Sequence, residues 1–105
     1  MKLSVAERII LFGLLPEKGT FLNLKQIRKV REDASFSDKE TKDFEIQTTA
    51  DGRIVWNPKK AKEVEIEISD SIHKIIKDKL EDLDKNAELE ERHFTLYEKF
   101  IINKG

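Results

Sequence analysis

The side chains that could do chemistry in this chain are many carboxylates and two histidines, with no cysteine. Glu90 and His93 have the Glu-x-x-His spacing that places two ligands on one helical face in carboxylate-bridged metal sites. Such a site needs further inward-facing carboxylates and a second copy of the motif, and the sequence offers neither. We therefore interpret His93 as a surface histidine and His73 as a boundary or surface residue. We predict no metal ion and no cofactor.

The sequence carries no recognisable catalytic constellation. Its four glycines are scattered, so they form no phosphate-binding loop. With two histidines and no cysteine, few pairs of nucleophile and base can be built. A hydrolase needs an acid whose pKa is raised by an apolar pocket, and no acid is isolated in that way. These observations predict a protein that is not an enzyme.

Uneven charge makes two surfaces candidates for binding. Residues 1–62 carry 13 basic and 9 acidic side chains, a net charge of +4, and residues 63–105 carry 7 and 12, a net of −5. The candidate nucleic-acid surface has two parts, the basic face of the second predicted helix and the loop that follows the only tryptophan. Its residues are Lys25, Arg28, Lys29, Arg31, Lys59, Lys60 and Lys62. The alternative is an ordinary solvated face and loop. The candidate protein-binding surface is an acidic strand face: Glu63, Glu65 and Glu67.

The strands that position these groups are predicted around an Asp-Gly turn at residues 51–52. β-branched and aromatic residues flank this turn, which predicts a β-hairpin over residues 45–57. A two-residue loop would place Gln47 opposite Trp56, whereas a three-residue loop places Ile46 opposite Trp56. We predict the three-residue loop, with its glycine in the left-handed conformation, because it gathers the apolar residues on one face.

Residues 63–68 alternate strictly between acidic and apolar side chains, which predicts a strand that is wet on one side. We expect this strand to join the hairpin in a three-stranded antiparallel sheet. Its apolar face would pack on helices through six residues: Ile46, Ile54, Trp56, Val64, Ile66 and Ile68. Trp56 would fill the space between sheet and helices, or would be an interaction anchor if it were exposed.

Three helices are predicted before the hairpin. Capping-box patterns at residues 4–7 and 37–40 open helices at residues 5–14 and 38–44. Pro16 stops the first helix, whose apolar residues cover nearly its whole circumference. Asn23 is predicted to cap the second helix, over residues 24–33, with Leu24, Ile27 and Val30 facing inward.

Two helices are predicted after the third strand. Ser69 or Asp70 caps an amphipathic helix whose inward residues are Ile72, Ile75, Ile76, Leu80 and Leu83. Residues 84–88 form a turn. The last helix begins either near Glu88 or near Leu96, and the pattern leaves both starts open.

At 105 residues, with 39% charged and 38% hydrophobic side chains, the chain is predicted to be one α+β domain, residues 1–105. Residues 1–62 form one part, and residues 63–105 supply the third strand and the C-terminal helices. The absence of cysteine, of a secretory signal pattern and of a membrane span predicts a cytoplasmic protein with no membrane partner.

The order of three short helices followed by a hairpin and a strand resembles winged helix-turn-helix domains, with residues 50–52 as the tip of the wing. The resemblance covers about residues 4–57 and implies DNA binding through the helix at residues 38–43. That helix carries three acids against two lysines, which opposes docking on phosphates. Residues 6–8, 14–16 and 96–100 also resemble segments of small phage or prophage accessory proteins of unassigned function.

The function predicted by elimination is a small binding or regulatory module, encoded by a phage or mobile element, that contacts another protein or a second copy of itself. The rival is a winged-helix DNA-binding regulator. An exposed apolar patch rimmed by acids would favour the module, and one contiguous basic stripe would favour the DNA-binding protein.

Overall fold

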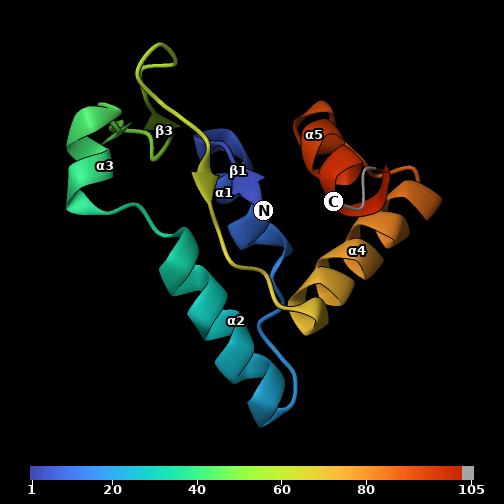
Figure 1. Ribbon diagram of the computed structural model, residues 1–105. Helices are drawn as coiled ribbons and strands as arrows, with labels where there is room; N and C mark the ends of the chain where they lie inside the picture. The colour runs from blue at the N-terminus through green and yellow to red at the C-terminus, as the bar shows by residue number, and fades with distance from the viewer. Residues whose placement is uncertain (103–105) are drawn as a thin grey trace.

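The computed structural model describes residues 1–102 and has the α+β fold predicted from the sequence (Figure 1). The first part contains β1 (Lys2–Leu3), α1 (Val5–Leu14), α2 (Phe21–Ala34) and α3 (Asp38–Asp43). The strands β2 (Gln47–Thr48), β3 (Ile54–Val55) and β4 (Val64–Glu65) follow. The last part contains α4 (Asp70–Lys85), the 3-10 turn η1 (Glu91–His93), α5 (Phe94–Tyr97) and the π-helical turn η2 (Glu98–Ile102).

α1 has the predicted bounds. The Ser4 hydroxyl accepts a hydrogen bond from the Glu7 amide, and the Glu7 carboxylate accepts one from the Ser4 amide, which completes the capping box. Leu15, which follows the helix, is extended at φ −74° and ψ 131° because the next residue is Pro16. The helix therefore stops where the sequence predicts.

α2 begins three residues earlier than predicted. The Thr20 hydroxyl, not Asn23, caps the helix by accepting a hydrogen bond from the Asn23 amide at 3.2 Å. Ile27 and Val30 are buried as expected, but Leu24 is 38% exposed. The prediction that Leu24 faces inward is therefore wrong, because the buried face of the helix runs through residues 27, 30 and 34.

The strands form two separate two-stranded sheets, so the predicted three-stranded sheet is wrong. β4 pairs with β1, with Leu3 opposite Val64, and does not pair with the hairpin. Alternation along residues 63–68 correctly marks Ile66 as buried and its glutamates as exposed. The alternation does not indicate which strand pairs with β4. The actual partner, β1, is two residues long, which is too short for a recognisable pattern.

The hairpin has the predicted register. Thr48 lies opposite Ile54, which is the pairing that the three-residue loop requires. Gly52 has a φ of 85°, in the left-handed region that glycine adopts without steric cost. However, Ile54 is 38% exposed and Trp56 is half-buried outside the main core, so this hairpin does not supply the expected apolar face.

The C-terminal segment differs from both predicted starts. α4 is capped by Ser69, as expected, and runs to Lys85. Ala87 then adopts a left-handed conformation, with φ 57°, and the Glu88 amide donates back to the Leu83 carbonyl. The last helical segment begins as a 3-10 turn at Glu91 and becomes α-helical at Phe94.

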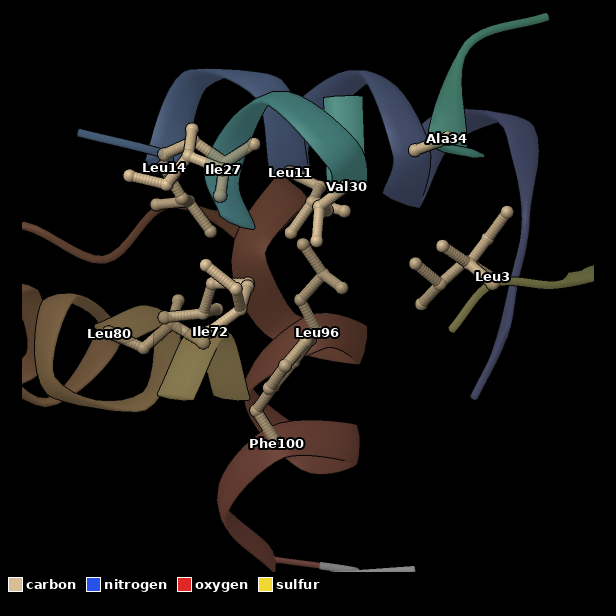
Figure 2. Packing of buried hydrophobic residues seen from close by; sticks show 13 residues of the cluster. Leu3, Leu11, Leu14, Ile27, Val30, Ala34, Ile72, Leu80, Leu96 and Phe100 are labelled. Carbon is tan, nitrogen blue, oxygen red and sulfur yellow. The ribbon is translucent and has the colours of Figure 1, made fainter. Parts of the chain in front are cut away.

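The hydrophobic core lies among α1, α2, α4 and the C-terminal turns (Figure 2). Leu11 and Val30 point from the α1–α2 layer toward Leu96. Phe100 lies next to Leu96, and both are fully buried. The core therefore depends on helices from the two ends of the chain, with Leu3 and Ile66 as the contribution of the β1–β4 pair.

Within residues 1–102, no helix is both long enough and apolar enough to cross a membrane.

Candidate interaction surface

A buried arginine fixes the positions of the first three helices. Arg8 on α1 is 1% exposed, and its guanidinium donates to the Ala34 and Ser35 carbonyls at 2.9 and 2.8 Å. It also forms a two-point ion pair with Glu40 on α3, at 2.6 and 3.1 Å. Phe36 covers the guanidinium, with its ring centre 4.4 Å from the central carbon. Arg8 therefore binds the C-terminal end of α2 and the capping box of α3 at once.

A second, partly buried group of ion pairs joins the two ends of the described chain. The Lys99 ammonium donates to Glu7 and Glu63 at 2.7 Å each and to the Lys2 carbonyl at 2.8 Å. Burial raises the pKa of Glu7, but hydrogen bonds from Lys99 and the Ser4 amide lower it more, so the net shift is downward. This lysine therefore holds one of the predicted protein-contact residues, Glu63, in a structural ion pair.

The predicted basic face of α2 is present at the surface. Lys25, Arg28 and Arg31 are exposed, and their side chains form no ion pair within residues 1–102. Lys29 is exposed but is paired with Asp33 at 3.0 Å and lies 3.7 Å from Glu67. The pairing raises the pKa of Lys29, chiefly through its hydrogen bond to Asp33. Three of the four predicted cations are thus available to a partner.

The predicted lysines of the loop are exposed, but they lie among acids. Lys60 is paired with Glu45 at 2.8 Å. The pKa of Asp43, on α3, is lowered chiefly by its hydrogen bond from Lys39, and the charge of Lys62 adds to this effect. Lys59 is exposed in the same loop. The loop lysines therefore partly neutralise the acids of α3 and its C-terminal end.

The predicted acidic face is exposed at all three positions. Glu63 is bound by Lys99, and Glu67 lies near Lys29 on α2. Glu65 is 69% exposed. Glu65 also lies 3.3 Å from the N-terminal ammonium of Met1. Because all three glutamates have cationic neighbours in the same chain, this face is less negative than the sequence alone indicates.

An exposed apolar surface at the start of α2 was not predicted. Phe21 is 83% exposed, Leu22 is 63% exposed and Leu24 is 38% exposed. Helical spacing places Phe21 on the same line as Lys25 and Arg28, opposite the buried face of the helix. We call Phe21, Leu22, Leu24, Lys25 and Arg28 the α2 patch. The sequence signal that could have revealed this surface is Thr20 as a capping residue, since a helix that begins directly after Thr20 places Phe21 on its outer face.

The patch does not match either surface that was expected. Its apolar residues are rimmed by Lys25 and Arg28, whereas acids were expected around an apolar binding patch. Figure 1 shows the first turns of α2 projecting away from α3 and the hairpin. The apolar and basic side chains of the patch therefore lie together at one end of the molecule.

The two histidines are not positioned as metal ligands. His93 is 6% exposed, so the prediction of a surface histidine is wrong. Its Nδ1 atom accepts a hydrogen bond from the Glu90 amide at 3.0 Å and caps η1. His73 is half-buried, as expected for a boundary position, and its ring centre lies 5.0 Å from that of Phe100. In the described part of the chain, no three His, Cys, Asp or Glu side chains are grouped closely enough for a metal ion.

A wide charged cleft of about 1100 Å³ lies between the β1–β4 pair and α4. Its lining mixes lysines, including Lys2, Lys77 and Lys99, with acids such as Glu65 and Asp70. Lys99 is already occupied by Glu7 and Glu63. The mixed signs give the cleft no clear preference for one class of ligand.

Comparison of the chain with protein-family models, curated proteins and solved structures finds no match.

Proposed function

We propose that the chain is a small non-enzymatic binding or regulatory module that acts through protein–protein contacts made by the α2 patch. The observation that carries the proposal is the 83% exposure of Phe21 beside exposed Leu22 and Leu24. A cluster of exposed apolar side chains is a common mark of an interaction surface.

The patch lies on an element whose position is fixed. Ile27, Val30 and Ala34 bury the opposite face of α2, and Arg8 binds the carbonyls at its C-terminal end. A partner would therefore meet a helix that is already ordered, so that binding would cost little additional conformational entropy.

The composition of the patch indicates the chemistry of its partner. Aromatic residues and arginine are enriched among residues that dominate binding energy. Phe21 and Leu22 would enter an apolar pocket, while Lys25 and Arg28 would pair with acids at its rim. We therefore expect the partner surface to be apolar in the centre and acidic at the edge.

Photo-crosslinking tests this proposal with a matched pair of exposed phenylalanines. A photoreactive amino acid is placed at position 21 in one variant and at position 94 in another, because Phe94 is also 60% exposed. Expressed in the cells that make the protein, the first variant should crosslink to a second polypeptide and the second should not. Equal products at both positions, or none at position 21, would contradict the proposal.

A winged-helix DNA-binding regulator is the second candidate, favoured by the element order and by cations on α2 that form no ion pair within residues 1–102. Lys25→Glu or Arg28→Glu should then weaken DNA binding and reduce its salt dependence. Fluorescence anisotropy with labelled duplex and single-stranded DNA, at low and near-physiological salt, measures this. The acids Asp38, Glu40 and Asp43 on α3 oppose this candidate, and absence of binding at low salt would reject it.

A further inference from the structure

Residues 36–62, which contain α3, β2 and β3, form a lobe that lies outside the hydrophobic core. None of the hydrophobic side chains of this lobe belongs to the core cluster or packs against it. The only buried apolar residues outside that cluster, within residues 1–102, are Phe44 in the lobe and Val5 on α1. Figure 1 shows α3 and the hairpin grouped at one end of the molecule, away from α4 and α5. Apolar packing therefore fixes the lobe less firmly than it fixes the core helices.

Inside the lobe, hydrogen bonds and ion pairs connect α3 with the hairpin. The strands β2 and β3 pair with each other and with no other strand. The Asn57 amide, after the hairpin, donates to the Phe44 carbonyl at the end of α3, at 2.9 Å. Lys60 forms an ion pair with Glu45 at 2.8 Å. The lobe is therefore a connected unit.

One residue, Arg8, makes the polar contacts between the lobe and the rest of the protein. Its guanidinium forms the two-point ion pair with Glu40, and the ring of Phe36 lies over it. Among residues 1–102, no other hydrogen bond or ion pair joins the lobe to residues outside it. Arg8 also binds the last two carbonyls before the lobe. It therefore lies where the chain enters the lobe and connects both sides of that point.

The chain leaves the lobe at a second fixed point. Glu63, the first residue after the lobe, accepts a hydrogen bond from Lys99 at 2.7 Å. The next residue, Val64, pairs with β1. A cation of the core thus holds the chain beside each end of the lobe, so that a movement of the lobe would be absorbed by the backbone near Phe36 and Lys62.

We propose that residues 36–62 are a hinged lobe, which the Arg8–Glu40 pair holds closed and which opens as a unit while the core stays folded. Opening breaks this pair but no hydrogen bond inside the lobe or the core. It exposes the guanidinium and moves α3 and the hairpin relative to the α2 patch, so the pair controls which surface the molecule presents. The proposal does not depend on the proposed function, because the α2 patch lies outside the lobe.

The pair can be weakened without removing the cap of α3. Glu40 accepts a hydrogen bond from the Ser37 amide at 3.1 Å, and glutamine can also fill this position of a capping box. Glu40→Gln therefore keeps the cap and removes the negative charge. Phe36→Leu is a second variant, which removes the ring over the guanidinium. Asp43→Asn is the matched control, because the ion pair of Asp43 stays within α3.

Distances between pairs of spin labels measure the movement, and the absence of natural cysteine allows labels at chosen positions. Lys42→Cys with Lys79→Cys joins the lobe to α4. Lys42→Cys with Arg53→Cys lies within the lobe, and Lys25→Cys with Lys79→Cys lies within the core. All four positions are exposed.

Pulsed electron spin resonance should give one narrow distance distribution for each label pair when the Arg8–Glu40 pair is intact. In Glu40→Gln and in Phe36→Leu, part of the lobe-to-α4 distribution should shift to longer distances, while the other two distributions stay unchanged. Asp43→Asn should leave all three distributions unchanged. Circular dichroism checks that each variant keeps its helices.

An unchanged lobe-to-α4 distance in a variant that combines Glu40→Gln with Phe36→Leu would overturn the proposal. Broadening of the distribution within the lobe would mean that residues 36–62 unfold instead of moving as a unit. Broadening within the core, or loss of the helical signal, would mean that the pair holds the whole fold. Either result would also overturn the proposal, and none of them bears on crosslinking from position 21.

Discussion

At the scale of single residues, Arg8 shows how a charged side chain can be buried and still be satisfied. Its bonds to Ala34, Ser35 and Glu40 replace the water that burial removes. These bonds connect α1 to the end of one helix and the start of another. Arg8 is therefore a structural residue rather than a binding residue, although it lies in the basic part of the chain.

Replacing Arg8 should destabilise the fold strongly. Arg8→Ala removes the donor to two carbonyl groups and the cationic partner of the Glu40 carboxylate, and it also creates a cavity, so we expect a loss of about 3–5 kcal/mol in the free energy of unfolding. Urea denaturation followed by circular dichroism measures this loss. Arg28→Ala, on the exposed face of α2, is the control and should change stability by less than about 0.5 kcal/mol. Similar losses for both variants would contradict the assigned role of Arg8.

The Arg8–Glu40 pair should also make stability depend on pH in the acid range. The hydrogen bonds from Arg8 lower the pKa of Glu40 below its ordinary value of 4.5. Because the folded pKa is the lower one, the stabilisation is complete above about pH 4.5 and is lost as the pH falls through the folded value.

Urea unfolding between pH 3 and pH 7 tests this prediction. Glu40→Gln should reduce the fall in stability toward acid compared with the natural chain. Glu81→Gln, a change at an exposed position on α4, should leave the pH dependence unaltered. An unchanged acid slope in Glu40→Gln would assign the acid sensitivity to other carboxylates, with Glu7 the next to test.

At the scale of elements, two helices end in the same unusual way. Glu45 after α3 and Ala87 after α4 both have positive φ angles, 56° and 57°. In each case the next amide donates to a carbonyl five residues back: Ile46 to Thr41 and Glu88 to Leu83. This is the Schellman arrangement, in which glycine is the usual residue at the left-handed position. The chain bears a steric cost at both helix ends.

Ala87→Gly should therefore stabilise the protein. Glycine relieves the left-handed strain at a modest entropic cost, so we expect a gain of about 0.5–1 kcal/mol in the free energy of unfolding. Thermal and urea unfolding measure the gain. Ala50→Gly is the matched control, because Ala50 is exposed in a turn without a positive φ and should not gain stability. A loss of stability in Ala87→Gly would mean that strain at this position is negligible.

Local elements could be predicted from the sequence because their signals are local. Ser4, Ser37 and Ser69 cap the helices that their patterns predict, and Gly52 sets the hairpin register. The pairing of β4 with β1 could not be predicted, because alternation marks a buried face without naming the neighbouring strand.

The candidate site was predicted only in part, for a related reason. The sequence predicts the cations of α2, but it also predicts Leu24 on the inner face and a helix that begins after Phe21, whereas the structure has Leu24 exposed and Phe21 inside the helix. Asn23 and Thr20 are both good capping residues, so the local capping signals allow a helix start at either position. The sequence alone therefore leaves the helix start, and with it the exposed phenylalanine, undetermined.

At the scale of the whole molecule, the last turns complete the core. Leu96 and Phe100 are fully buried, and Figure 2 shows Leu96 facing Leu11 and Val30 with Phe100 next to it. Lys99 binds Lys2, Glu7 and Glu63 beside them. The C-terminal segment is therefore part of the folding unit, and its removal would uncover the apolar faces of α1 and α4.

Phe100→Ala should cost about 3–5 kcal/mol in the free energy of unfolding, since a large buried ring is replaced by a cavity. Phe94→Ala, in the same segment, removes an exposed ring and should change stability by less than about 0.5 kcal/mol. Parallel urea titrations of the two variants check the difference. Equal losses would show that burial of the C-terminal segment does not determine stability.

The contacts of Lys99 and the β1–β4 pair also govern when the protein can fold during its synthesis. Leu3 leaves the ribosome about sixty residues before its strand partner Val64, and Phe100 emerges later still. Before Phe100 emerges, α1 and α2 have no complete core to pack against, and their apolar faces stay accessible to solvent and to chaperones. The nascent chain should therefore fold in one late step, after the last turns have emerged, rather than helix by helix.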